Sequence, residues 1–235
     1  MHSQRSATSH ITAATLEQFE QRYRARFINS LSGFKSANLI GTCDDKGQTN
    51  LAIVSSVFHL GANPPLMGFI SRPPTAGNAS HVERHTLSNL IESGFFTLNS
   101  VSIPMTKAAH QTSARYPQTT SEFDVTGLTA AFLNRFPAPF VEESPIKIGL
   151  EVREHHHLSI NNTVLIIGEI KEVHLPTAAI QPDGFVDIED LGLVTISGLD
   201  SYHLTERMMR LSYAKPDKPL DMLSLQGSRI DASLS

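Results

Sequence analysis

Residues 50–58 have the sequence Asn-Leu-Ala-Ile-Val-Ser-Ser-Val-Phe, and residues 64–72 have the sequence Pro-Pro-Leu-Met-Gly-Phe-Ile-Ser-Arg. Both stretches are rich in the apolar and β-branched residues that favour strands. An apolar run at 37–43 precedes the first stretch. Asp-Asp-Lys-Gly at 44–47 lies between this run and residues 50–58. This pattern predicts a hairpin of residues 37–43 and 48–59, followed by a short strand at 66–70.

The rest of the chain continues this pattern of short strands with inserted helices. Alternating or continuous apolar runs predict strands at 95–101, 146–152 and 164–174, the last two joined through residues 155–162. Spacings of three and four predict helices at 16–28 (capped by Thr15), 85–94, 105–116, 128–136 and 202–211. About six strands joined by short turns favour a mainly β fold, an antiparallel barrel with peripheral helices, over βαβ units.

Composition limits the possible functions. The chain has 235 residues, 40% of them hydrophobic, and a formal net charge of −4, so it has enough apolar material for a real core and no basic field for nucleic acid. No apolar run approaches the roughly 20 residues that cross a membrane. Cys43 is the only cysteine, which excludes an intrachain disulfide and agrees with a cytoplasmic protein, our expected location.

Polar side chains interrupt these strands at three places. Ser55 and Ser56 lie between β-branched residues, Ser71 and Arg72 end the strand after the two prolines, and Thr86 lies at the start of a predicted helix. Hydroxyls, a guanidinium and a helix N-terminus together suit a phosphate and a polar ring. Each feature also has an ordinary structural explanation: a serine bonded to neighbouring backbone, a solvated arginine, and a helix cap.

The order of these motifs resembles the flavin reductase-like proteins with the FMN-binding split barrel, over roughly residues 30–215. The most specific matches are at 50–58, 64–66, 71–72, 86–90 and 95–99. Further matches are at 121–124, 127–128, 144–146, 199–202 and 210–213. The resemblance implies a six-stranded antiparallel Greek-key split barrel of the FMN-binding type. The strand order indicates a single domain over residues 1–235, with an N-terminal helix at 15–28 and a C-terminal arm at 216–235.

The resemblance further implies a function and a cofactor site. The expected activity is that of an NAD(P)H-dependent oxidoreductase that passes a hydride from NADH or NADPH to the N5 atom of FMN, with FAD less favoured. A homodimer with flavin near the interface and a partner oxygenase or other electron acceptor are expected, without nucleic acid or membrane. The cofactor-binding residues carried over are Asn50, Ser55, Ser56, Val57, Phe58, Ser71, Arg72, Arg84, Thr86 and Asn89.

One motif departs from the family pattern. Many relatives have Lys-Asp-Thr where this chain has Arg84-His85-Thr86. Arginine preserves the positive charge but differs from lysine in reach and geometry. The phosphate side of the expected site therefore rests on fewer matching residues than the strand at 50–58.

Histidines and hydroxyls suggest other chemistry. His155, His156 and His157 are consecutive and lie between charged and polar residues, so we interpret them as a solvated strand end and expect no metal site. His110 and His203 are candidates for lining the active site. No nucleophile elbow surrounds Ser55 or Ser56, and we expect no catalytic acid or base. The alternatives are a non-enzymatic flavin-binding protein of the same fold, and a small barrel that binds haem or another ligand.

Overall fold

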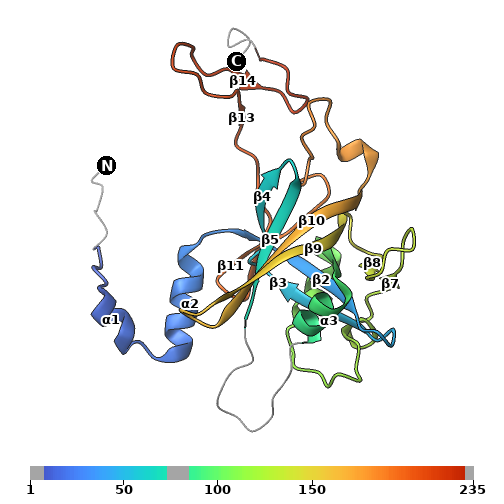
Figure 1. Ribbon diagram of the computed structural model, residues 1–235. Helices are drawn as coiled ribbons and strands as arrows, with labels where there is room; N and C mark the ends of the chain where they lie inside the picture. The colour runs from blue at the N-terminus through green and yellow to red at the C-terminus, as the bar shows by residue number, and fades with distance from the viewer. Residues whose placement is uncertain (1–7, 73–84, 231–235) are drawn as a thin grey trace.

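A seven-stranded antiparallel sheet forms the body of the protein (Figure 1). The computed structural model describes residues 8–72 and 85–230. The strand order is β3-β2-β6-β9-β10-β5-β4. The strands are β2 (Asn38–Cys43), β3 (Thr49–Val54), β4 (Phe58–Ala62), β5 (Pro65–Ser71), β6 (Phe95–Ser100), β9 (Lys147–Leu158) and β10 (Thr163–His174). The mainly β, antiparallel fold expected from the sequence is confirmed.

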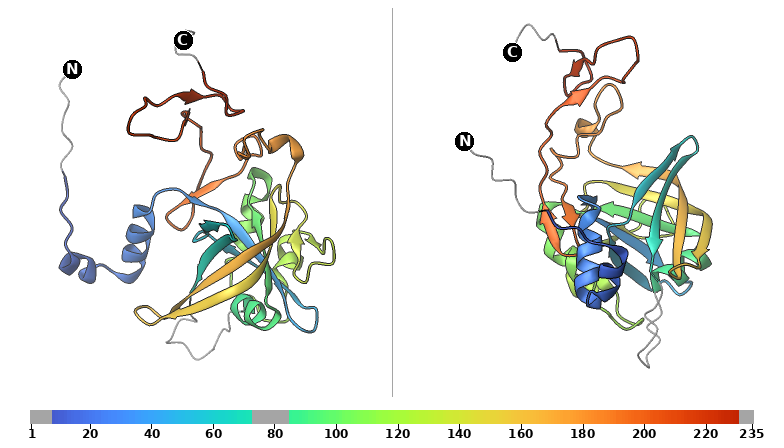
Figure 2. Two further views of the ribbon diagram at one scale, coloured as in Figure 1. Left: turned by 45° about the horizontal axis from the view of Figure 1, so that its top comes forward. Right: turned by 90° about the vertical axis from the view of Figure 1, so that its left-hand side faces the viewer.

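The two edge strands of this sheet are consecutive in the chain. β3 ends at Val54 and β4 begins at Phe58, so the link between opposite edges spans at most about 14 Å. The sheet must therefore curl until its edges approach one another, and Figure 2 shows the strongly twisted sheet that results. The single strand predicted at 48–59 is wrong for this reason: it divides into two strands, which makes seven strands in place of six.

Ser56 connects the link to the far edge of the sheet. Phe58 pairs with Gly68, and the same register places Ser56 opposite Ile70. The Ser56 hydroxyl accepts a hydrogen bond from the Ile70 N–H (3.1 Å) and donates one to the Ile70 carbonyl (3.2 Å). Ser56 precedes β4, so its side chain, in place of strand pairing, satisfies the N–H and the carbonyl of Ile70.

A first apolar cluster packs residues from the whole width of the sheet. Val54 and Val57 contact the same cluster as Phe69 of β5 and Ile166 of β10, which is possible only because the sheet is curled. Helix α3 (His85–Ser93) adds Leu90, which is fully buried. Gly94 ends the helix with a φ of 74°, the left-handed conformation that glycine adopts most easily. The predicted helix at 85–94 is therefore confirmed.

A second apolar cluster lies on the opposite face of β2 and β3, since neighbouring strand residues point to opposite faces. Leu39 and Leu51 of those strands pack there with Val101, Met105 and Phe123. The segments η1 (Ile103–Met105), α4 (Thr106–Gln111) and α5 (Glu122–Thr126) contribute to this cover. The smaller sheets are β1 (Lys35–Ser36) with β11 (Thr195–Ser197) and β12 (Ser201–His203), β7 (Ala130–Ala131) with β8 (Phe140–Val141), and β13 (Arg210–Leu211) with β14 (Met222–Leu223). A 3-10 turn, η2 (Thr177–Ala179), follows β10.

The prediction of one continuous N-terminal helix at 16–28 is wrong. The segment forms two helices, α1 (Ala13–Gln18) and α2 (Gln21–Leu31). Phe19 between them is extended, and the Glu20 carboxylate accepts the N–H groups of Arg22 and Tyr23, which starts a new helix. Thr12 rather than Thr15 caps α1.

Two other expected helices are absent because short paired strands form in their segments, and a third expected helix is shorter. Residues 128–136 contain β7, and residues 202–211 contain the end of β12 and all of β13, so neither segment is a helix. The expected helix at 105–116 is shorter and ends at Gln111. β9 runs through His155–His157, which pair with residues 164–166 of β10, and only residues 159–162 connect the two strands.

Ser56→Ala tests the connection across the curled sheet. Loss of the two hydrogen bonds to Ile70 should lower the free energy of unfolding by about 1–2 kcal/mol. Equilibrium urea unfolding of the ligand-free protein measures this change. Ser55→Ala is the matched control, because the Ser55 hydroxyl makes no hydrogen bond with the described residues, and equal effects of the two variants would contradict the role of Ser56.

Candidate functional site

The link between β3 and β4 carries backbone polar groups that have no hydrogen-bond partner among the described residues. Ser55, Ser56 and Val57 are half-buried, and no strand pairing or backbone hydrogen bond found among the described residues uses their N–H or carbonyl groups. Half-buried backbone groups normally have partners. The link is therefore the strongest candidate in the described structure for contact with a ligand.

The exposed edge of β3 just before the link is closed by side chains. The Leu51 N–H donates to the Glu122 carboxylate (2.9 Å), and the Ile53 N–H donates to the Thr112 hydroxyl (2.9 Å). These bonds prevent another strand from pairing with the edge. The unbonded backbone is thereby confined to the link that follows.

Glu122 is a buried carboxylic acid beside this edge, with only 7% of its surface exposed. Burial raises the pKa of Glu122 above its usual value, against the opposing effects of the Leu51 N–H and the nearby His85. The sequence prediction did not include Glu122 or Thr112 as functional residues. The signal for Glu122 was present, because Ser121-Glu122 belongs to a stretch that matches the family.

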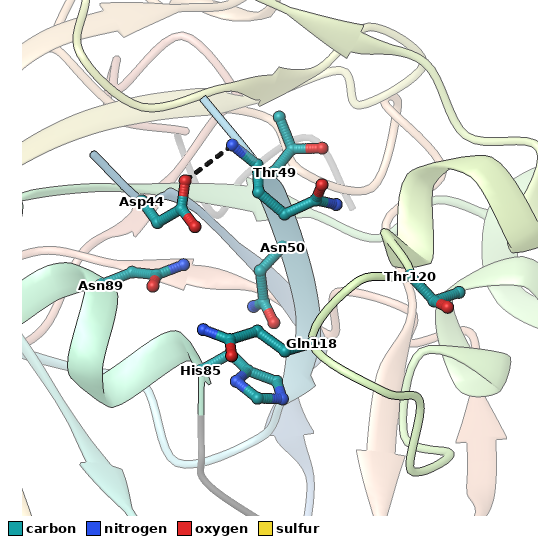
Figure 3. A pocket seen from close by; sticks show the side chains of 8 residues that line it. Asp44, Thr49, Asn50, His85, Asn89, Gln118 and Thr120 are labelled. Carbon is teal, nitrogen blue, oxygen red and sulfur yellow. Dashed lines mark hydrogen bonds between the residues drawn. The ribbon is translucent and has the colours of Figure 1, made fainter. Parts of the chain in front are cut away.

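Asn50, Thr86 and Asn89 come together at the start of α3. The Asn50 amide donates to the Thr86 hydroxyl (2.8 Å), and the Asn89 amide donates to the Thr42 hydroxyl (3.2 Å). These bonds hold the helix against the β2–β3 hairpin. Figure 3 shows a small polar pocket beside them, lined by Asp44, Gln48, Thr49, Asn50, His85, Asn89, Gln118 and Thr120.

Ser71 and Arg72 lie in a second group, at the end of β5. Ser71 is half-buried and pairs with Val164, whereas Arg72 is exposed. The Arg72 guanidinium donates to the side-chain oxygen of Asn29 on α2 (3.4 Å). Among the described residues, no hydrogen bond joins this group to Thr86 or Asn89. Arg84, the other expected cation, lies outside the described residues.

Phe58 and Val57 differ in which of their atoms a ligand in the candidate site could reach. The Val57 side chain packs on the core, so only its backbone is available to a ligand. Phe58 is 38% exposed, and its ring occupies the space beside Gly68 that a Cβ atom there would fill. Phe58 thus covers β5 next to the link.

The two singled-out histidines have protein partners. His110 bonds the Tyr202 hydroxyl through Nδ1 (2.9 Å), and His203 bonds the Ser197 hydroxyl through Nε2 (2.8 Å). The His203 ring also packs edge-on against Phe34. Within residues 8–72 and 85–230, His, Cys, Asp and Glu form no group of three that would hold a metal ion, and no helix there is long and apolar enough to cross a membrane.

The fold and the site define a mainly β protein whose candidate binding site lies where the edges of a curled antiparallel sheet meet. Residues 31–189 match the family model of the flavin reductase like domain. This match covers more than half of the chain, and the chain belongs to the flavin reductase-like family. The resemblance inferred from the motifs is confirmed.

Solved structures agree with this assignment. A protein from Shewanella frigidimarina NCIMB 400, described as a flavin reductase with a split barrel domain, is 51% identical, with a TM-score of 0.83 over 88% of this chain and 100% of that chain. Nitrilotriacetate monooxygenase component B from Bacillus cereus is 20% identical, with a TM-score of 0.75 over 87% and 99%. A 2-nitrobenzoate 2-nitroreductase from Pseudomonas fluorescens is 19% identical, with a TM-score of 0.73 over 90% and 98%. The last two show likeness of fold.

Glu122→Gln tests the buried carboxylic acid. The folded-state pKa is raised above the unfolded value near 4.5, so wild type should be most stable relative to the variant below that pH. Its advantage should decrease as the pH rises through the folded pKa. The glutamine oxygen can still accept the Leu51 N–H, so the variant should remain folded.

Urea unfolding of both proteins from pH 4 to 8 gives this difference directly. Glu142→Gln, which removes an exposed carboxylate, is the matched control for the loss of a charge. A wild-type advantage that increases with pH would contradict the raised pKa of Glu122.

Proposed function

We propose that the protein is an FMN-dependent NAD(P)H oxidoreductase. The observation that carries this proposal is the half-buried backbone of Ser55–Val57, whose N–H and carbonyl groups make no hydrogen bond with the described residues. The confirmed family gives the chemical class of the ligand. The closeness of a relative described as a flavin reductase supports the same activity.

The link fits the polar edge of a flavin ring. The isoalloxazine carries alternating hydrogen-bond acceptors and donors along its pyrimidine side, and a three-residue backbone segment offers both kinds of partner. Val57 directs its side chain into the core, so its backbone faces away from that core. We assign Ser55, Ser56, Val57 and Phe58 to the ring, with Ser56 held in place by its two bonds to Ile70.

The phosphate end of the cofactor needs charge rather than a flat surface. Ser71 and Arg72 provide a hydroxyl and a guanidinium at the end of β5, which suit a phosphate. We assign Asn50, Thr86 and Asn89 to the side of the ribityl chain. The Asn50–Thr86 bond sets the position of both side chains.

The residues of this chain orient the reactants and exclude water. Bound FMN would accept a hydride at N5 from the reduced nicotinamide, which requires no side chain to take up a proton in that step. The link contributes fixed hydrogen bonds, and the core residues beneath it keep one side of the site dry. Because the flavin would supply the redox chemistry and the protein the orientation, the site can consist of backbone and hydroxyl groups, without a catalytic acid or base.

The reduced cofactor must pass its electrons to an acceptor. One structural neighbour is component B of a monooxygenase, and another is a nitroreductase. These names suggest two fates for the reduced cofactor: use by a partner oxygenase, or reduction of a small organic acceptor on the same protein. We propose the first as the working model, in keeping with the oxygenase partner that the name of component B implies for that protein.

We propose that the protein acts as a homodimer with flavin near the interface. Neither α1 nor α2 contains a buried residue, yet Phe19, Tyr23 and Phe27 form an aromatic cluster on them. Figures 1 and 2 show these helices projecting from the sheet. Short helices gain most of their stability from packing, and a second copy would cover this cluster.

A cytoplasmic location fits the free thiol of Cys43.

Absorption spectroscopy of the purified protein tests the proposed activity. We expect tight binding of FMN, weaker binding of FAD, and FMN-dependent oxidation of NADH or NADPH under steady-state conditions. Bound flavin without turnover across several acceptors would favour a flavin-binding protein that is not an enzyme. Protein that binds no flavin, or that shows a haem spectrum, would overturn the proposal.

Sedimentation velocity tests the dimer. Wild type should sediment as a dimer, and Phe27→Ser should weaken the association at least tenfold because it removes an aromatic contact from the uncovered helix. Phe132→Ser changes an exposed phenylalanine outside α1 and α2 and is the matched control. A monomeric wild type at micromolar concentration would contradict the dimer.

A further inference from the structure

The C-terminal segment after β12 forms a hairpin that projects from the main sheet (Figure 1). β13 pairs with β14, with Leu211 opposite Met222. The Ser212 N–H donates to the Asp221 carbonyl (2.9 Å), which extends the same register toward the turn. The segment is therefore a two-stranded ribbon, and such a ribbon is only marginally stable unless a face of it packs on another layer.

One face of this hairpin is fastened to residues 183–189 by arginine side chains. The Arg210 guanidinium pairs with the Asp183 carboxylate (2.6 Å) and lies 4.2 Å from the centre of the Phe185 ring. Only 14% of the Arg210 side chain is exposed. Arg207 pairs with Asp187 (2.6 Å) just before the hairpin. These largely shielded charged contacts fix the conformation of the hairpin within a single copy.

The opposite face of the hairpin is apolar and uncovered. Successive residues of a strand point to opposite faces. The face that turns away from Arg210 carries five apolar residues at spacings of two: Met209, Leu211, Tyr213, Leu220 and Met222. Their exposed fractions run from 46% to 89%. About half or more of each residue on this hairpin face is therefore in contact with solvent in a single copy.

A second apolar surface lies on α1 and α2, away from the hairpin in the three views of Figures 1 and 2. It contains the aromatic cluster of Phe19, Tyr23 and Phe27. Tyr23 is 58% exposed, and Leu31, four residues beyond Phe27 on the same side of α2, is 68% exposed. One chain thus presents two uncovered apolar surfaces that it does not pack against each other.

The two surfaces match in chemistry and in size. The hairpin face brings two methionine sulfurs and the helices bring three aromatic rings, and contacts between sulfur and aromatic rings are favourable. Five side chains that are half exposed or more offer on the order of 500 Å². In a two-fold dimer each copy gives one hairpin and receives one, so the exchange would bury on the order of 1,000 Å² per copy, more than the roughly 800 Å² per partner of a standard interface.

We infer that the apolar face of the C-terminal hairpin packs on the α1–α2 aromatic cluster of a second copy, so that two copies exchange hairpins. The inference rests on the proposed homodimer and names the element that covers α1 and α2. Arg207 and Arg210 hold the hairpin in place for this exchange, because a segment fixed in advance loses less conformational entropy on binding.

A double-mutant cycle tests the contact. Met222→Ser should weaken dimerisation at least tenfold, as should Phe27→Ser. The combined variant should be little weaker than either alone, because both changes remove the same contact. Sedimentation velocity gives the dissociation constant of each protein. Ile160→Ser changes a 93% exposed residue between β9 and β10 and is the matched control, which should dimerise like wild type.

Two results of this cycle would overturn the inference. Additive losses in the combined variant would mean that Met222 and Phe27 act at separate places. Unchanged dimerisation of Met222→Ser would leave the hairpin face to a different protein.

Cysteine cross-linking locates the contact without depending on its strength. Cys43 is the only cysteine and is buried, so an introduced cysteine supplies the accessible thiol. Tyr213→Cys and Tyr23→Cys proteins with different tags are purified separately, mixed until they exchange subunits, and treated with a short bismaleimide. Cross-linked pairs should contain one chain of each kind, and neither protein alone should cross-link.

Every other pattern of cross-links contradicts the exchange. Pairs formed by Tyr213→Cys protein alone would place hairpin against hairpin. Equal cross-linking of Tyr213→Cys to an Ile160→Cys control would indicate chance collision. A cross-link within one chain of the double variant Tyr23→Cys/Tyr213→Cys would place the hairpin on its own helices.

Failure of the inference and failure of the proposed function are distinguishable. A wild-type dimer that shows no cross-link between positions 213 and 23 keeps the homodimer and overturns the hairpin exchange. A wild-type monomer at micromolar concentration overturns both the homodimer and the exchange. FMN binding and oxidation of NADH or NADPH by that monomer would still support the proposed enzymatic activity.

Discussion

The rest of the structure depends on one covalent constraint: a three-residue link joins the two edge strands of a seven-stranded sheet. Because the edges must come within the reach of that link, the sheet curls and residues from β3, β5 and β10 pack in one apolar cluster. The Ser56 hydroxyl strengthens the same junction through Ile70. Without the curl these edges would be open to pairing with other strands.

The same constraint determines where polar groups remain available. Glu122 and Thr112 accept hydrogen bonds from two N–H donors on the exposed edge of β3. Ser56 bonds both the N–H and the carbonyl of Ile70. The link itself cannot pair with either neighbouring strand, because it crosses from one edge to the other. A curled sheet thus produces a local strip of half-buried backbone that makes no hydrogen bond within the described parts of the chain, and a planar polar ligand suits such a strip.

Much of the fold followed from the pattern of residues, and several elements did not. The hairpin around residues 44–47 and the helix ending at Gly94 carry short-range signals, so the sequence predicted both. The segments at 128–136 and 202–211 have helical spacing, but pairing with a neighbouring strand, β8 or β14, decides their conformation. A period of three to four residues carries no information about such a partner strand.

The sequence by itself determined the mainly β class, the family, and the residues from Asn50 to Phe58 as the centre of interest. Only the tertiary structure decided that Ser55–Val57 form a link between two edges, because a strand break and a strand have the same local apolar pattern. Only the tertiary structure placed Arg210 against Asp183 and Phe185. Arg210 is distant from those two residues along the chain, and only the return of the C-terminal segment beside residues 183–189 brings them together.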